Sequence, residues 1–219
     1  MIQRTAASAS VAELPFDLCV FVNCPFDKEY LRLLHAMLFA IHDCGFIARI
    51  AVEDTGSNEM RIDKVVRIIR QSRYSIHDIS RVELSSAGLP RFNMPFECGL
   101  AMGAIRFGEP SPTRDFLLMA AVPYQDKLTL SDLAGQDPKA HSNDAAKLTA
   151  AVRAFLSAKK PKGEKTRGAA AIVGRYQRFL AALPGLSKSL QYTDDEILSF
   201  DYLRDWLDLM ATWLIRTPR

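Results

Sequence analysis

The chain lacks the features that mark several common protein classes. No apolar run approaches the roughly 20 residues that a membrane-spanning helix needs, and the best stretch, Phe116 to Val122, is about a third of that length. The four cysteines form no CxxC pair and have no His-x-x-x-His partner, so the sequence signatures of zinc and redox sites are missing. The 28 basic residues exceed the 25 acidic ones by only three, too small a surplus to indicate nucleic-acid binding by the whole chain.

The composition that remains is that of a globular protein. Of the 219 residues, 48% are hydrophobic and 24% are charged, which is enough to build a core and excludes wholesale disorder. Residues 1–16 lack the continuous apolar centre of a secretory signal, so we expect a flexible N-terminal leader. We therefore expect a cytoplasmic protein without membrane association, whose cysteines are reduced and mostly buried.

Strand-like and helix-like segments alternate through the first half of the chain. Short apolar runs predict strands at 18–22, 46–52, 74–80 and 116–122, and helical spacing of apolar residues predicts helices at 27–44, 62–69 and 96–107. This alternation predicts an α/β domain over residues 17–145, with a doubly wound parallel sheet that is covered by helices on both faces.

Residues 146–219 have a different character and predict an α-helical extension, because apolar residues recur at helical spacing in three segments. Nine Lys and Arg against one acid lie between Arg153 and Lys188, whereas six acids against one base lie between Thr193 and Asp208. These opposite charges suit attraction between the two halves or between subunits. The apolar stripe with Trp206 and Trp213 suits a homo-oligomer, although packing against the sheet domain is the favoured explanation.

Two polar segments have both a functional and a structural interpretation. The stretch 131–141 is long and polar enough to close over a ligand, or it is a solvated connection to the helical extension. The basic run 159–165 is expected to be an exposed linker. Nucleic-acid binding there is disfavoured because no aromatic side chains interleave the lysines.

A ligand-binding site is expected where the strand order of such a sheet reverses, outside the carboxyl ends of the strands. With a flavodoxin-like order, the loop 23–27 meets the segment 78–80, and a helix that begins near Met94 carries Glu97 to the same place in its first turn. Asp78 and Glu97 would then share one pocket, suited to holding ribose hydroxyls and a cationic sugar. Each acid also has a structural interpretation, Glu97 as a first-turn acid facing the helix dipole and Asp78 as a turn cap.

Other reactive residue types in this region also have structural interpretations. Cys24 is a possible nucleophile, but a cysteine at a strand end without a neighbouring histidine is more typical of packing. Ser80 either binds phosphate or caps a turn. We expect His77 to be packed and hydrogen-bonded within its strand, and His35 and His42 to flank the surface of the first helix.

Three segments together resemble a known clan of proteins. They are Val20 to Asp27, Ser75 to Ser80, and Asn93 to Gly103, of which the last contains a Glu-x-Gly-x-Ala-x-Gly helix after an Asp-ended strand. They resemble the clan that joins nucleoside 2-deoxyribosyltransferases with bacterial Toll/interleukin-1 receptor (TIR)-like nucleotide-binding proteins. The resemblance covers about residues 17–123, and the insertion-like segment 82–91 departs from the clan's usual short connection.

The resemblance implies a flavodoxin-like fold and gives Glu97 the position of the active-site glutamate. That residue is the nucleophile in the transferases and supports cleavage of NAD in TIR enzymes. Asp78 takes a position near the sugar. The remaining residues that the resemblance and the strand-end rule place at the nucleotide are Asn23, Cys24, Pro25, Phe26, Asp27, Asp54, Ser80 and Met94.

The resemblance thus predicts a TIR-like N-glycosidase, a hydrolase that cleaves the nicotinamide–ribose bond of NAD or a related nucleotide. It also implies a role as an antiphage effector in bacterial immunity. The nucleotide is the substrate or ligand, and no metal or cofactor is required. Two alternatives remain open: base exchange of the deoxyribosyltransferase type, and a non-catalytic module that senses a nucleotide and oligomerises.

Overall fold

The computed structural model describes residues 14–52, 58–81, 91–109, 112–123, 130–133 and 135–217. Five parallel strands form one sheet in the order β2-β1-β3-β4-β5. The strands are β1 (Cys19–Asn23), β2 (Ile47–Arg49), β3 (Tyr74–Asp78), β4 (Asp115–Ala120) and β5 (Lys139–Ala140). The chain winds outwards in both directions from β1 and β3, which confirms the flavodoxin-like, doubly wound α/β fold.

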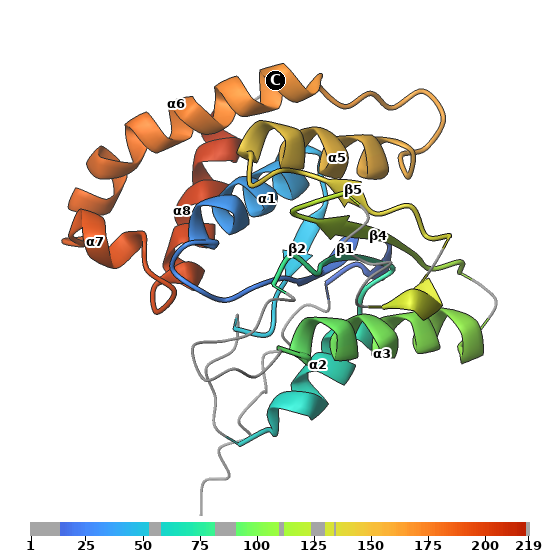
Figure 1. The fold of residues 1–219 in the computed structure, drawn as a ribbon. Coiled ribbons are helices and arrows are strands. Elements are labelled where there is room, and N and C mark those ends of the chain that lie inside the picture. Colours follow the sequence, from blue (N-terminus) through green and yellow to red (C-terminus); the bar gives the residue numbers. More distant parts are fainter. Residues whose placement is uncertain are drawn as a thin grey trace, which may run out of the picture.

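Helices cover both faces of the sheet (Figure 1). One face carries α1 (Leu31–Asp43) and α5 (Ala145–Ser157), and the other carries α2 (Arg61–Arg70) and α3 (Asn93–Phe107). Residues 146–219 are largely helical, as predicted, but α5, which the prediction assigned to the extension, packs on the sheet. The remaining helices form a further layer over α1 and are α6 (Ala169–Lys188), α7 (Asp194–Ile197) and α8 (Leu203–Arg216). Two short 3-10 helices complete the described elements, at Phe16–Leu18 and Ser131–Leu133.

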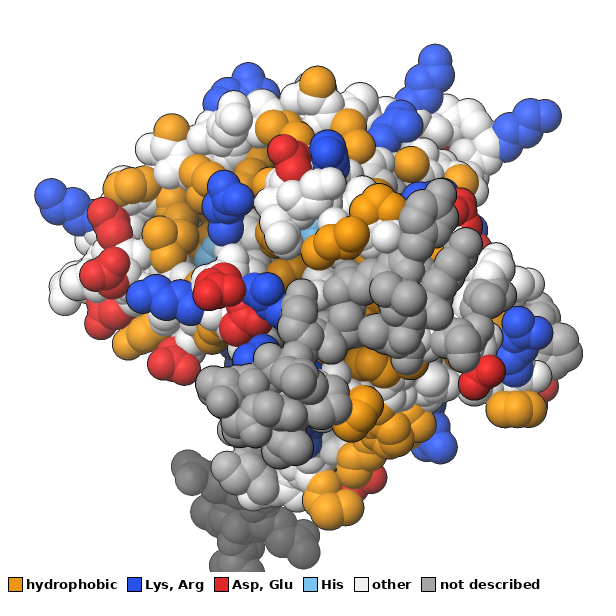
Figure 2. Space-filling view, in the orientation of Figure 1, with side chains coloured by type: hydrophobic (Ala, Val, Ile, Leu, Met, Phe, Trp, Pro, Cys, Tyr) orange, Lys and Arg blue, Asp and Glu red, His pale blue; other side chains and the backbone are white. Residues whose placement is uncertain are grey.

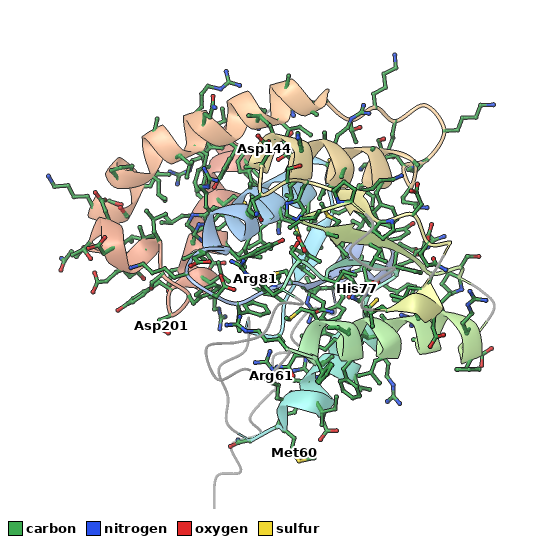
Figure 3. All side chains as sticks on the ribbon, in the orientation of Figure 1. Met60, Arg61, His77, Arg81, Asp144 and Asp201 are labelled. Atoms are coloured by element: carbon green, nitrogen blue, oxygen red, sulfur yellow. The ribbon has the colours of Figure 1, made fainter. Side chains whose placement is uncertain are left out.

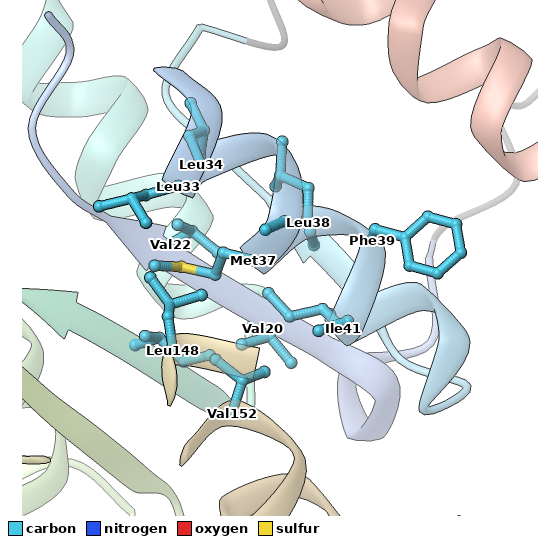
Figure 4. Packing of buried hydrophobic residues seen from close by; sticks show 14 of the residues in the cluster. Val20, Val22, Leu33, Leu34, Met37, Leu38, Phe39, Ile41, Leu148 and Val152 are labelled. Atoms are coloured by element: carbon cyan, nitrogen blue, oxygen red, sulfur yellow. The ribbon is translucent and has the colours of Figure 1, made fainter. Parts of the chain in front are cut away.

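The inner strand β1 contributes to the core on both sides of the sheet, because successive side chains of a strand point to opposite faces. Val20 and Val22 pack beneath α1 and α5, where Leu148 of α5 joins them (Figure 4). Phe21 faces the other way, towards α2 and α3. All five residues of β1 are buried, as the continuous apolar run predicts.

Helix α1 is covered on two sides, and ten of its thirteen residues are buried. Phe39 points away from the sheet (Figure 4), and its ring centroid lies 5.8 Å from that of Phe179 in α6. The fully buried Trp206 of α8 stacks on the His35 ring at 4.3 Å. The prediction that His35 lies at the surface is therefore wrong, because the outer helical layer covers that side of α1, and His42 is half-buried.

The outer layer is also held by a buried ion pair. Arg175 of α6 donates from Nε to Oδ1 of Asp43 at the end of α1 over 2.7 Å, and from Nη2 to the carbonyl oxygen of Thr217 after α8 over 2.9 Å. The apolar stripe of α8 is thus used inside the chain, and homo-oligomerisation stays a prediction.

The cysteine prediction is confirmed, since all four thiols are free and buried. Among the described helices, none combines the length and the apolar character that crossing a bilayer requires. Four short elements were not predicted, namely α7, the edge strand β5 and the two 3-10 helices. The strand β5 belongs to the polar stretch 131–141, so part of that stretch extends the sheet.

Candidate functional site

A cavity of about 710 Å³ lies beside the carboxyl end of β1 and the start of α3. Its volume falls within the range of about 300 to 1,000 Å³ that is usual for small-molecule sites. The position is the one expected for a doubly wound sheet, next to the point where the strand order reverses. Ten described residues line it, namely Asn23, Cys24, Phe26, Asp27, Arg61, Arg91, Phe92, Asn93, Met94 and Glu97.

Glu97 is the acid that reaches the cavity without a bonded partner. It is only 7% exposed and makes no hydrogen bond within the described part of the chain, and its nearest cation is Arg61, whose Nη2 lies 3.9 Å from Oε1. Burial raises the pKa of the Glu97 carboxyl above its ordinary value, and the Arg61 charge opposes part of this rise. A carboxyl that is buried without hydrogen bonds costs stability, and such groups concentrate at functional sites.

Glu97 lies beyond the first turn of α3, so the structure does not favour the helix-dipole explanation of this acid. Helix α3 begins at Asn93, earlier than predicted, so Glu97 is its fifth residue and no acid lies in its first turn. The favourable effect of the dipole on an acid falls off within that first turn. The dipole therefore accounts poorly for a buried acid at this position.

Asn23 fixes α3 against the sheet and thereby positions Glu97. Its Nδ2 donates to the carbonyl oxygen of Met94 over 2.8 Å and to Nδ1 of His77 over 3.1 Å. With Nδ1 accepting, Nε2 of His77 donates to Oγ of Ser75 over 2.9 Å. Burial lowers the pKa of His77 to about 3, so the imidazole is neutral at pH 7, and the prediction of a packed, hydrogen-bonded histidine is confirmed.

Asp78 is buried and is not among the residues that line the cavity. Its side chain has no exposed surface and accepts hydrogen bonds from the backbone N–H and Oγ of Ser80, from the hydroxyl of Tyr30, and from Nε2 of His141 at 2.9 Å. Burial would raise the pKa of Asp78, but the hydrogen bonds from His141, Ser80 and Tyr30 outweigh it and hold the pKa below its ordinary value. Asp78 therefore joins the ends of β3 and β5 to the start of α1, and we call these four residues the Asp78 cluster.

The Asp78 cluster contains the residue types of a nucleophilic triad but not its geometry. Nε2 of His141 faces both Oγ of Ser80, at 3.0 Å, and Asp78, while Nδ1 accepts from the backbone N–H of Asn143 at 3.1 Å. In a Ser-His-Asp triad the two ring nitrogens serve different triad members. Ser80 and His141 are also buried, so a substrate has no access to the serine hydroxyl.

The loop after β1 contributes Cys24, Phe26 and Asp27 to the cavity lining. Cys24 has no exposed surface, and burial raises the pKa of its thiol well above the ordinary value, with the negative charges of nearby acids adding to the rise. A thiol in this state is protonated and is a poor nucleophile. Pro25 is buried and does not line the cavity, whereas the half-buried Phe26 does.

Asp27 lines the cavity but is already paired. It accepts hydrogen bonds from Nε and Nη2 of Arg81 at 3.0 and 3.2 Å, from Nη1 of Arg91 at 3.3 Å, and from the backbone N–H of Tyr30 at 2.9 Å. Although burial raises the pKa of Asp27, the hydrogen bonds from Arg81 and Tyr30 and the charges of Arg81 and Arg91 hold it below its ordinary value. Asp27 is therefore ionised at neutral pH.

Six of the ten predicted site residues thus line one cavity. Asp78, Ser80 and Pro25 do not line it, and Asp54 lies outside the described residues. Sequence reasoning missed four lining residues, Arg61, Arg91, Phe92 and Asn93. The sequence could have indicated the two arginines as site residues. Arg61 begins a helix and Arg91 precedes one, and both helices follow strands of the parallel sheet.

Among the described residues, no group of three or more His, Cys, Asp and Glu is arranged to hold a metal ion. Comparisons of the chain with protein-family models, with curated proteins and with solved structures give no significant match.

Proposed function

We propose that this chain is a TIR-like N-glycosidase that cleaves the nicotinamide–ribose bond of NAD or a related nucleotide. The observation that carries the proposal is Glu97, a buried carboxyl without a hydrogen bond in the described part of the chain, in a ligand-sized cavity at the reversal of strand order. The flavodoxin-like order and the resemblance of residues 17–123 to the TIR and deoxyribosyltransferase clan support it.

The chemistry asks for one negative group beside the sugar. When the bond from ribose C1′ to the nicotinamide nitrogen breaks, both bonding electrons leave with the nitrogen, and the sugar becomes an oxocarbenium ion. A carboxylate at Glu97 stabilises that cation strongly, because the buried site screens charge less than bulk water does. Water then adds to C1′ and releases a proton, which completes the hydrolysis.

The nature of the leaving group favours NAD over an ordinary nucleoside. Nicotinamide is cationic while it is attached to ribose and leaves as a neutral molecule, so no general acid has to protonate it. The only other carboxylate lining the cavity among the described residues is Asp27, which is held ionised by Arg81 and is unsuited to donate a proton. Among the described lining residues, Glu97 is thus the one acid without a hydrogen bond, and this arrangement fits a cationic leaving group best.

In this proposal the other residues bind or position. Phe26 and Phe92 offer aromatic surfaces at the cavity wall against which the nicotinamide ring can stack. Asn23 and Asp78 act through the backbone that they hold: Asn23 fixes the start of α3, and Asp78 fixes the end of β3 against α1. Neither is expected to touch the sugar.

The test is the release of nicotinamide from NAD by the purified full chain, measured by liquid chromatography. We expect Glu97→Gln, which keeps the shape and removes the charge, to lose about 100-fold or more of the activity. Glu164→Gln is the matched control, because Glu164 is exposed on the loop before α6. The proposal is refuted if wild type and Glu97→Gln cleave NAD equally. It is also refuted if the wild type cleaves no NAD in any oligomeric state that is assayed.

Base exchange between deoxynucleosides is the second candidate, and one observation favours it. Neither oxygen of Glu97 is hydrogen-bonded in the described part of the chain, so the carboxylate is free to attack C1′ as a nucleophile. Mass spectrometry that detects a sugar covalently attached to Glu97 would separate this reaction from direct hydrolysis. Nucleotide binding without any product would instead favour a sensing module.

A further inference from the structure

We propose that Arg61 and Arg91 form a phosphate subsite in the same cavity, so that the substrate is a nucleotide and the corresponding nucleoside is a poor one. This inference rests on the proposed function for the reaction, but the subsite itself can be tested by binding alone. It assigns a role to two lining residues that neither the sequence patterns nor the resemblance had singled out.

Most N–H donors of the two guanidinium groups make no hydrogen bond within the described part of the chain. A guanidinium carries five N–H donors. Within the described part of the chain Arg61 makes no hydrogen bond, because its contact with Glu97 is 3.9 Å long, and Arg91 makes one, of 3.3 Å to Asp27. Asp27 does not depend on Arg91, because Arg81 already gives it two hydrogen bonds. Binding an anion therefore costs little in lost contacts.

Both arginines lie at or near the start of a helix. Arg61 is the first residue of α2, where Figure 3 shows it, and Arg91 lies two residues before α3 begins at Asn93. The start of a helix carries a partial positive charge, so cations are disfavoured there and anions are favoured. A phosphate placed beside Arg61 and Arg91 would offset that repulsion. Arginine also matches phosphate geometrically, because its planar donors can bond two oxygens at once.

The cavity is thus lined by both an acidic side chain and basic side chains that can contact a ligand. Glu97 supplies the negative charge that the reacting sugar needs, and the two arginines supply positive charge in the same cavity. A nucleotide carries its cation-forming ribose carbon and its phosphate on one sugar. Figure 2 shows hydrophobic side chains exposed over α2 and α3. The exposed Met60, just before α2, and Phe96, in the first half of α3, add apolar area close to these helix starts.

The experiment uses two compounds that differ only by a phosphate, nicotinamide mononucleotide and nicotinamide riboside. Binding to the full chain is measured by isothermal titration calorimetry in the Glu97→Gln background, so that neither compound is consumed. We expect the mononucleotide to bind at least about 10-fold more tightly than the riboside, as charge-assisted hydrogen bonds to phosphate require. Adding Arg61→Gln and Arg91→Gln should abolish this ratio and leave riboside affinity within about twofold, since those contacts involve only the phosphate.

Three controls keep the result interpretable. Arg178→Gln removes an exposed arginine from α6, remote in the fold from the cavity, and should leave the ratio unchanged. Inorganic phosphate alone should bind more weakly than the mononucleotide, since equal affinity would indicate a simple anion site and overturn the nucleotide assignment. Thermal melts check folding of the double variant, in which both replaced side chains are largely exposed.

The outcomes separate the subsite from the proposed function. Equal affinities for the two compounds, no binding of the mononucleotide, or a double variant that loses riboside and mononucleotide affinity alike would each overturn the subsite. If wild-type protein hydrolyses both compounds with equal kcat/KM, the subsite fails and the function stands. If the mononucleotide binds through the arginines but neither it nor NAD is cleaved, the function fails and the subsite stands.

Discussion

Replacing Asp78 with alanine separates its two possible roles, as a contact to the sugar and as the centre of a buried cluster. The carboxylate receives hydrogen bonds from Tyr30, from both the backbone and the side chain of Ser80, and from His141. Asp78→Ala leaves these donors without an acceptor in a region that has no exposed surface at Asp78 or His141. An unsatisfied buried donor costs about 1 to 3 kcal/mol.

We expect Asp78→Ala to lower the free energy of unfolding by about 4 kcal/mol, the usual cost of breaking a buried charged network. For a chain of this length, that loss corresponds to a fall in Tm of roughly 8 to 16 °C. The measurement is thermal and urea unfolding followed by circular dichroism, with Glu97→Gln as the comparison. A Tm within about 2 °C of wild type would refute the structural role of the Asp78 cluster.

The pH dependence of unfolding gives an independent check on Asp78. Its folded pKa lies below the ordinary value of 3.8, so the folded state binds fewer protons than the unfolded state in that range. The stabilisation is therefore complete above the ordinary pKa and is lost as the pH falls through the folded pKa. Wild type should lose stability in this acid range, and Asp78→Asn should show a smaller loss. Parallel curves for the two proteins would contradict the assignment.

Three further predictions concern stability. The folded pKa of Glu97 is raised, so the destabilisation caused by its burial increases as the pH rises above 4.5. At pH 7, Glu97→Gln should unfold at a urea concentration equal to or higher than that of the wild type, and a clearly lower one would contradict this. Burial lowers the pKa of His35 from 6.5 to about 4, so a stabilisation of about 3 kcal/mol is present above pH 6.5 and is lost as the pH falls towards 4. His35→Phe should therefore reduce the slope of the free energy of unfolding against pH over that interval, and an unchanged slope would count against this assignment. Arg175→Met should cost about 3 kcal/mol by leaving Asp43 buried beside only the weaker Arg167 contact, and adding Asp43→Leu should restore most of the loss in urea unfolding.

The sequence predicted the sheet well where a strand is a continuous apolar run. The strand at 18–22 corresponds to β1 and the strand at 74–80 to β3, because strands buried on both faces show in composition alone. The two-residue β5 escaped prediction, since its pairing with β4 arises from the tertiary fold and its local sequence is polar. His35 was misplaced for a related reason. Periodicity shows which side of a helix is apolar, but it cannot show that a second helical layer covers the other side.

The candidate site shows the same division between local and tertiary information. Glu97 could be assigned to the strand ends from topology alone, since α3 is the helix that follows β3 in the chain. Asp78 satisfies the same rule, yet its side chain turns into the protein, because Tyr30 and His141 from distant parts of the chain meet it there. The arginines of the phosphate subsite lie in or near helix starts whose positions depend on loop lengths, and composition does not fix these.

The sheet has very short strands at both of its edges. β2 has three residues and β5 has two, and they flank longer strands of five or six residues. An exposed edge is a template on which another polypeptide can add a strand, and natural proteins shorten their edges to prevent this. The short edges of the described sheet leave few unpaired backbone groups, so they are poor templates for the addition of a strand from another chain.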